Sequence, residues 1–196
     1  KLYKVTIIEL GVQSLDDEVL ISSDRGHDSS CVYSSSKLIK EYGFKLGLQM
    51  MVGLPNDTYD KVVHTAKEFV KIKPDYVRIY PVLVIKDTKF EERLNNREYK
   101  ALNIEETIEI VKKVFLLLTY NNIKVIRIGL QATYEINYNE SIVGGPFHPS
   151  FGELIFSRLY RDFIELMIKE NSLKAGIIVE VNNSLVSQII GNKKQN

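Results

Sequence analysis

Two side chains near the end of the first strand-like segment are suited to binding a small polar ligand. Gln13 closes this segment, and its side-chain amide can both donate and accept hydrogen bonds. Arg25 follows in the next loop, where its guanidinium could bind a carboxylate through two parallel hydrogen bonds. A surface ion pair of Arg25 with Asp24 or Asp28 is the alternative. Barrel enzymes place their sites at the carboxyl ends of strands, where Gln13 is expected.

The strand-like segments have one apolar side-chain parity and one polar parity. In the second segment Leu48 and Met50 alternate with Gln49. Successive side chains of a strand point to opposite faces, so we expect the apolar set to meet helices and the polar set to line one concave surface. Because burying unpaired arginines costs several kcal/mol, a cavity for anionic groups is expected there. An internal Arg–Glu network or exposed edge strands are the alternatives. Besides Gln13 and Gln49, the expected lining residues are Glu9, Arg78, Tyr80, Arg127 and Gln131.

The order of elements indicates an α/β protein with a parallel sheet. Helical patterns of ten or more residues separate most of the strands, and such helices form crossover connections between parallel neighbours. Asn103 and Glu106 resemble a capping box at the start of one helix. Strands are expected over 3–10, 45–51, 75–81, 123–130 and 175–181, with helices near 29–42, 58–72, 104–121, 149–170 and 184–190.

The composition bounds the class of protein. A chain of 196 residues with 44% apolar residues suits one domain with a substantial core. Lys and Arg (26) nearly balance Asp and Glu (25), so no overall basic field indicates nucleic acid, although a local basic face stays open. The longest apolar run, around 114–118, is too short to cross a bilayer, and no secretion leader opens the sequence, so no membrane partner is expected.

A single cysteine, Cys31, excludes an internal disulfide and any all-cysteine metal site within one chain. It fits a reducing compartment, and we expect a cytoplasmic protein. His27 and His148 are too isolated to indicate a metal pair, so no metal ligand is assigned and their roles stay open. The chain begins at Lys1 in strand-like sequence and stops at Asn196 just past a helical pattern, so we expect a segment of something longer.

Six blocks of the sequence recur in one order in a known family. Together they resemble the Elongator catalytic subunit family of radical S-adenosylmethionine (radical SAM) proteins, over about residues 9–162. VRIYP followed by IRIGLQ is the most specific pair. The blocks are ELGVQS (9–14), RGH (25–27), GFKLGLQMMVGLP (43–55), PDYVRIYPVLVIKDT (74–88), IKVIRIGLQ (123–131) and GPFHPSFGEL (145–154).

The resemblance implies a partial (β/α) barrel with parallel strands, the C-terminal half of a radical SAM barrel over 1–170, followed by an extension over 171–196. In this family a 4Fe-4S cluster and SAM produce a 5′-deoxyadenosyl radical, used in modifying the wobble uridine of tRNA, so tRNA is an expected partner. The three-cysteine cluster loop is expected before Lys1. This chain alone is therefore expected to hold neither SAM nor the cluster tightly, and to be inactive. The acetyltransferase domain of longer members has no match here.

The GVQS and GLP blocks are also similar to those of oxygen-independent coproporphyrinogen III oxidase, a broader relative. Its SAM-binding positions correspond to Gln13, Arg25 and Gln49 in this sequence, and Gln49 replaces an acidic residue. The resemblance thus implies an amide near the nucleoside and a guanidinium for the methionine carboxylate. A porphyrinogen-oxidase-like radical SAM enzyme and a non-catalytic binding module are the alternative functions.

The strand expected over 3–10 has no neighbour on its N-terminal side in this sequence. Its unpaired N–H and C=O groups would form an exposed sheet edge, which favours pairing with another chain. We expect self-association across this edge, or a helix folded over it.

Overall fold

The computed structural model describes residues 3–130, 141–172 and 178–191. Contacts divide the chain into two compact units, residues 1–149 and 150–196. The radical SAM half-barrel predicted to end at residue 170 stays a prediction, since a division by contacts does not test a boundary defined by family.

Four parallel strands form one sheet in the first unit, in the order β1-β2-β3-β5. Helices lie between successive strands along the chain, so the predicted α/β class with a parallel sheet is confirmed. Among the described strands the sheet stays open, which agrees with the predicted partial barrel. The strands are β1 (Ile7–Gln13), β2 (Lys45–Val52), β3 (Tyr76–Pro81) and β5 (Lys124–Ile128).

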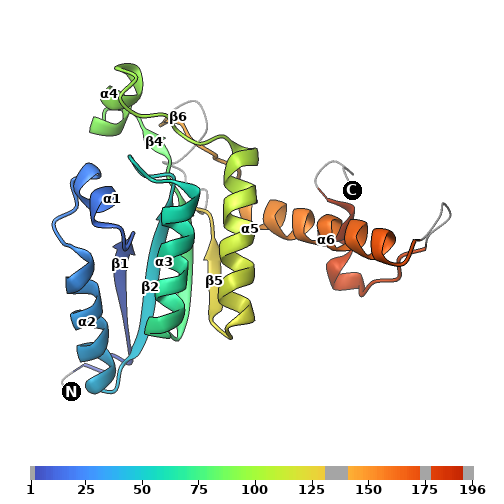
Figure 1. Ribbon diagram of the computed structural model, residues 1–196, viewed down its shortest axis with the longest axis horizontal. Helices are drawn as coiled ribbons and strands as arrows, with labels where there is room; N and C mark the ends of the chain where they lie inside the picture. Colours follow the sequence, from blue (N-terminus) through green and yellow to red (C-terminus); the bar gives the residue numbers. More distant parts are fainter. Residues whose placement is uncertain (1–2, 131–140, 173–177, 192–196) are drawn as a thin grey trace. The chain divides into compact units, whose positions relative to one another are not determined.

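Three helices cover one face of this sheet (Figure 1). They are α2 (Ser29–Glu41), α3 (Tyr59–Ile72) and α5 (Ile104–Tyr120). The apolar parity of the strands meets them, as predicted from the alternation, and Phe69 of α3 and Leu118 of α5 contribute to the same core. Full burial of each such side chain stabilises the fold by about 1.5–3 kcal/mol. Strand residues with no exposed surface are Leu46, Leu48, Met50, Val77 and Ile79.

Side-chain caps explain where the long helices begin. Thr58 accepts a hydrogen bond from the backbone N–H of Lys61 at the start of α3. The predicted capping box of α5 is confirmed: Glu106 N donates to Asn103 Oδ1, and Asn103 N donates to Glu106 Oε2, each at 2.9 Å. The helices therefore start at positions set by short polar residues.

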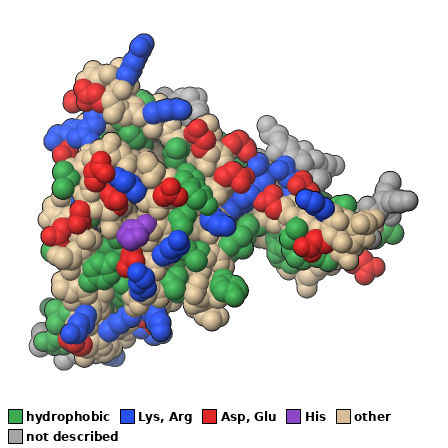
Figure 2. Space-filling model, viewed as in Figure 1, with side chains coloured by type: hydrophobic (Ala, Val, Ile, Leu, Met, Phe, Trp, Pro, Cys, Tyr) green, Lys and Arg blue, Asp and Glu red, His purple; other side chains and the backbone are tan. Residues whose placement is uncertain are grey.

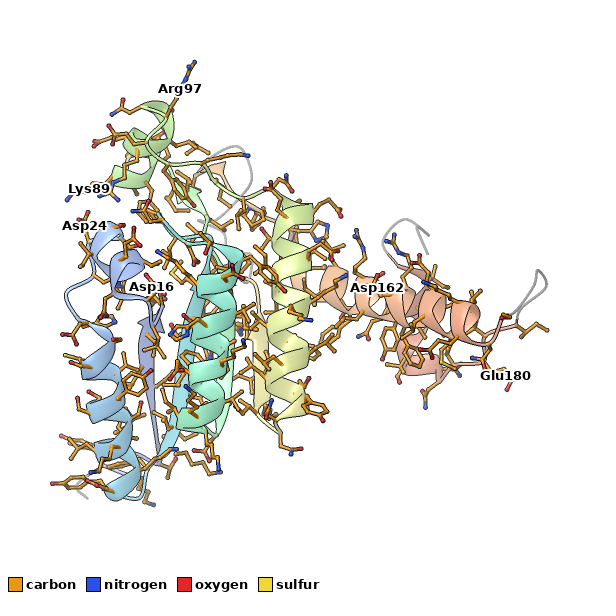
Figure 3. All side chains as sticks on the ribbon, in the orientation of Figure 1. Asp16, Asp24, Lys89, Arg97, Asp162 and Glu180 are labelled. Carbon is orange, nitrogen blue, oxygen red and sulfur yellow. The ribbon has the colours of Figure 1, made fainter. Side chains whose placement is uncertain are left out.

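Several short elements of the first unit were not expected from the sequence. An antiparallel pair joins β4 (Val84–Ile85) to β6 (Ile142–Gly144), and two short helices, α1 (Asp17–Ser22) and α4 (Lys89–Asn95), lie near the carboxyl ends of the strands. Asp24 links α1 to α4, because its carboxylate lies 3.0 Å from Arg93 Nη2 and 3.8 Å from Lys89 Nζ (Figure 3). These elements frame the loops that follow β1 and β2.

The second unit contains α6 (Phe151–Glu170), the 3-10 turn η1 (Asn183–Leu185) and α7 (Val186–Ile190). Helix α7 packs against α6.

Two strand predictions need correction. The strand predicted over 175–181 is wrong in its described part, since residues 178–181 are not in a strand, and residues 175–177 lie outside the described residues. Ile178 is 86% exposed, so this apolar segment has no sheet face to cover. The first strand begins at Ile7 rather than at residue 3, because its pairing with β2 begins at Lys45. No helix in the described part of the chain is both long and apolar enough to cross a membrane.

Candidate functional site

The register of the sheet aligns polar residues from all four strands. Partners in adjacent parallel strands project to the same side, and Gln49 is the partner of Gly11 on one side and of Arg78 on the other. Arg78 in turn is the partner of Arg127. We call the sheet side opposite α2, α3 and α5 the open face. It carries Glu9, Gly11, Gly47, Gln49, Tyr76, Arg78 and Arg127.

A β-bulge places Arg127 in this row. The pairing of β3 with β5 shifts by one residue after Val77 and Val125, so that Arg78 meets Arg127 and Ile126 is the extra residue. Ile126 is 41% exposed, unlike the apolar strand residues that meet the helices. The bulge therefore resets the alternation in β5.

Glu9 is the centre of a hydrogen-bonded network on the open face. Gln49 Nε2 donates to Glu9 Oε1, and Arg78 Nε lies 3.2 Å from Glu9 Oε2. The N–H of Arg78 Nε is not aimed at that oxygen, so this contact is an ion pair without a hydrogen bond. Arg78 Nη1 also lies 3.4 Å from the Tyr80 hydroxyl. The internal Arg–Glu network, an alternative in the sequence, is therefore present in the structure.

Tyr76 belongs to the same network, although the sequence did not single it out. Burial is the main cause that raises the pKa of Tyr76, and a hydrogen bond to Glu9 raises it further. The ring crosses directly over Gly47, where an added Cβ would lie 2.6 Å from the Tyr76 hydroxyl oxygen. Gly47 thus leaves the space through which Tyr76 reaches Glu9.

Gln13, at the end of β1, has an unusual backbone conformation. Its φ of 66° lies in the left-handed region, and the pairing of β1 with β2 shifts between Gly11 and Gln13. An added Cβ at Gly11 would lie 2.9 Å from Gln13 Nε2. The absence of a side chain at Gly11, the sheet partner of Gln49, therefore leaves the space that the Gln13 amide occupies.

The loop after β1 is held by α3 and by the turn that carries Arg25. Thr65 Oγ1 accepts from Leu15 N at 3.0 Å and lies 3.4 Å from Ser14 Oγ. His27 Nε2 lies 3.2 Å from the carbonyl oxygen of Val12. Thr65 and His27 together fix the backbone on either side of Gln13, the last residue of β1.

The Gly-Leu-Pro turn after β2 is fixed by the half-buried carboxylate of Asp57. Asp57 accepts hydrogen bonds from the backbone N–H groups of Gly53 (3.2 Å) and Thr58 (3.0 Å). Burial nevertheless raises the pKa of Asp57 to about 6, against the lowering effect of these donors. The Tyr99 hydroxyl donates to the carbonyl of Gly53, and burial, assisted by the Asp57 charge, raises the pKa of Tyr99 to about 12.

Of the predicted site residues, the structure brings together Glu9, Gln13, Gln49, Arg78, Tyr80 and Arg127. Arg25 is not part of this network, because it lies in the loop between α1 and α2 with an exposed side chain. Gln131 lies outside the described residues. Their binding roles stay predictions.

The donor set fits SAM better than it fits an iron–sulfur cluster. Two amides and two guanidiniums on one face can bind the hydroxyl, nitrogen and carboxylate groups of SAM. Cluster iron is held by thiolates, and the sequence has only Cys31, which is exposed. Within the described ranges, no group of three or more His, Cys, Asp or Glu side chains could hold a metal ion.

Comparisons with known proteins find similarity to radical SAM proteins. A family model described as "Radical_SAM C-terminal domain" matches residues 74–161. Elongator complex protein 3 of Bos taurus is 34% identical over 119 residues, which is 59% of this chain and 22% of that protein. A tRNA uridine(34) acetyltransferase of Methanocaldococcus jannaschii is 37% identical over 109 residues, 54% of this chain and 20% of that protein.

A solved structure supports the same relationship. The Elp3 protein of Methanocaldococcus infernus, with an N-terminal deletion, superposes with a TM-score of 0.65 at 27% identity. The match covers 86% of this chain and 37% of that one. The chain thus spans only about a fifth of the length of the curated relatives above.

Proposed function

The chain belongs to the radical SAM proteins of the Elongator catalytic subunit type, as part of the C-terminal half of their radical SAM domain, and from this premise we propose that its open face binds SAM. The Elongator-like relatives modify tRNA, and we propose tRNA as the substrate of the complete protein. A cytoplasmic location is part of the same proposal.

The alignment of Gln49, Arg78 and Arg127 in one row carries this proposal. Gln13 and Gln49 supply amide donors and acceptors that suit the nucleoside of SAM, and Arg25 supplies a guanidinium for the methionine carboxylate. Glu9 acts indirectly, because it accepts from Gln49 Nε2 and holds that amide in one orientation. A preorganised amide loses less side-chain entropy when it binds a ligand.

A 4Fe-4S cluster, when bound by the complete protein, would supply the electron that cleaves SAM to methionine and a 5′-deoxyadenosyl radical. This chain contributes binding and orientation only, since its single cysteine, Cys31, cannot replace a three-cysteine cluster loop. We therefore propose that the 196 residues alone are catalytically inactive.

The test is anaerobic reconstitution of the complete protein, as encoded by its native reading frame, with iron and sulfide. We expect absorbance typical of a cluster, followed by SAM-dependent release of 5′-deoxyadenosine. If neither appears, the enzymatic proposal fails and a non-catalytic binding module becomes the better account. If a porphyrinogen stimulates SAM cleavage and tRNA does not, the substrate belongs to the alternative, porphyrinogen-oxidase-like class.

We further propose that the outer edge of β1 pairs with another chain. Within the described residues, β1 has only β2 as a sheet neighbour, and Ile7 is 43% exposed. A cavity of about 240 Å³ beside this strand is lined in part by Gly11, His27 and Cys31. Light scattering of the 196-residue chain should give a mass above that of a monomer. A monomeric mass over the whole concentration range would contradict the proposal.

A further inference from the structure

Arg25 has two acidic neighbours in its loop, and both carboxylates are engaged by other groups. Asp28 accepts a hydrogen bond from the backbone N–H of Cys31 at 2.9 Å, as the cap of α2. Asp24 Oδ2 lies 3.0 Å from Arg93 Nη2. Among the described residues, Arg25 forms no ion pair with either carboxylate. The exposed guanidinium of Arg25 therefore keeps its N–H groups for a ligand.

Arg93 of α4 binds the turn that comes just before Arg25. Its two terminal nitrogens reach different groups of that turn: Nη1 donates to the carbonyl oxygen of Ser22, and Nη2 donates to the carboxylate of Asp24 at 3.0 Å. The Arg93 side chain is 26% exposed, so these contacts are partly shielded from water. A guanidinium presents its N–H groups in a planar fork, whereas a lysine ammonium is a single point of charge. One arginine thus holds both the backbone and the acidic side chain of the turn.

The turn ends α1 in a conformation that fixes the backbone of Arg25. Asp24 has a φ of 54°, in the left-handed region, and the N–H of Arg25 donates to the carbonyl of Leu20 at 3.0 Å. This hydrogen bond is typical of a helix that ends with a left-handed residue. On the other side of Arg25, His27 Nε2 lies 3.2 Å from the carbonyl oxygen of Val12 in β1. The backbone of Arg25 is thereby held from both sides near the end of β1, while its side chain stays exposed.

Apolar packing makes α4 a firm support for these contacts. Phe90 and Leu94 pack against a buried cluster that includes Val19 of α1. Phe90 also stacks on Tyr99, with the ring centroids 5.6 Å apart. Figure 2 shows basic side chains beside an acidic one where α4 meets α1, at the upper left of the view. Arg93 therefore acts between two helices that the packing already holds together.

We infer that Arg93 is a positioning residue for Arg25: by binding Ser22 and Asp24, it keeps the backbone of Arg25 in place and its guanidinium free for the methionine carboxylate of SAM. This role rests on the proposed function, which assigns that carboxylate to Arg25. Without Arg93, the Asp24 carboxylate would be released beside Arg25 and would compete with the ligand for the same guanidinium. The effect of Arg93 on SAM binding should therefore pass through Arg25.

The experiment measures the affinity of the reconstituted complete protein for SAM and for 5′-methylthioadenosine, which has the nucleoside of SAM but no carboxylate. Arg25→Gln and Arg93→Gln should each weaken SAM binding by about tenfold, and the double variant should bind no more weakly than Arg25→Gln alone. Both single variants should bind 5′-methylthioadenosine as the parent does, whereas a general structural loss would weaken both ligands. Lys89→Gln is the matched control on the same helix, because Lys89 is 80% exposed and lies 3.8 Å from Asp24, a surface pair that contributes little.

A further variant tests the competing carboxylate. Asp24→Asn removes the charge and tolerates the left-handed backbone, so adding it to Arg93→Gln should recover part of the lost SAM affinity. Parent-like SAM binding by Arg93→Gln, when Arg25→Gln binds more weakly, would overturn this role alone. Additive losses for Arg25→Gln and Arg93→Gln would also overturn it. Parent-like SAM binding by Arg25→Gln would overturn the carboxylate assignment in the proposed function, and the role of Arg93 with it.

Discussion

The two sides of the parallel sheet differ in burial and polarity, although they are made by alternate residues of the same strands. On the helical side, Leu48 has no exposed surface and contacts apolar neighbours. On the open face, Gln49 is partly exposed and donates to Glu9. The helical side therefore supplies stability through apolar burial, while the open face keeps polar groups that burial alone would not select. Ligand binding is expected where the sequence departs from the pattern of a fully covered parallel strand.

The largest effect should come from the helical side. Leu48→Ala removes a fully buried side chain of β2 and leaves a cavity, so the free energy of unfolding should fall by about 2–5 kcal/mol. Urea denaturation followed by circular dichroism measures this change. A loss below about 1 kcal/mol would show that α2 and α3 do not pack against the sheet as closely as the structure indicates.

The second prediction concerns Asp57, a half-buried carboxylate that has no cation as its partner among its described hydrogen bonds. Its folded pKa of about 6 is above the ordinary aspartate value of 3.8, so the folded chain holds this proton more tightly than the unfolded chain does. The resulting stability is fully present below about pH 3.8 and is lost as the pH rises through about 6.

Asp57→Asn should remove this component. The difference in free energy of unfolding between the two chains should change by about 2–3 kcal/mol between pH 4 and pH 7, with the parent losing stability relative to the variant as the pH rises. Urea titrations at several pH values measure it. A constant difference across that range would show that the pKa of Asp57 is not raised by burial.

The third prediction concerns a steric clash on the open face. Gly47→Ala places a Cβ against the Tyr76 ring, so the ring must move away from Glu9, and stability should fall by about 1–3 kcal/mol. Adding Tyr76→Leu should recover part of that loss, because the two residues share one space. Additive losses in a double-mutant cycle would contradict the proposed contact.

The smallest effect on stability should come from Gln49→Ala, next to Leu48 in the same strand. Gln49 keeps some exposed surface, so removing its hydrogen bond to Glu9 should cost about 1 kcal/mol. The same urea titration used for Leu48→Ala measures it. Equal losses for the two neighbours would remove the distinction between the two sides of the sheet.

The alternation of apolar and polar residues was enough to predict which residues of β1, β2 and β3 share a face, because successive side chains of a strand point to opposite faces. The position of Arg127 beside Arg78 depends on a bulge, however, and nothing in residues 123–128 marks where the extra residue lies. The crossing of Tyr76 over Gly47 was also missed, since both read as ordinary strand residues. The glycine on the polar parity was the available signal, because glycine in a strand often marks a close approach.

For Arg25 the sequence predicted a role, but the structure of this chain does not position the side chain for it. Its proposed role came from the family resemblance, and the structure of this chain leaves its side chain exposed in a loop. Contacts made by a loop side chain with a ligand depend on the ligand, so neither spacing nor the fold alone positions it. The short β4–β6 pair escaped prediction for a related reason: two and three residues, with their partners nearly 60 positions apart, carry no periodic signal.

The central claim is that the open face binds SAM, and the affinity of the reconstituted complete protein for SAM tests it most directly. Gln49→Ala and Gln13→Asn should each weaken SAM binding by about tenfold, with asparagine chosen at position 13 because it tolerates the left-handed backbone. Gln188→Ala in the second unit is the control and should bind as the parent does. If both open-face variants bind SAM as tightly as the parent, the account is contradicted.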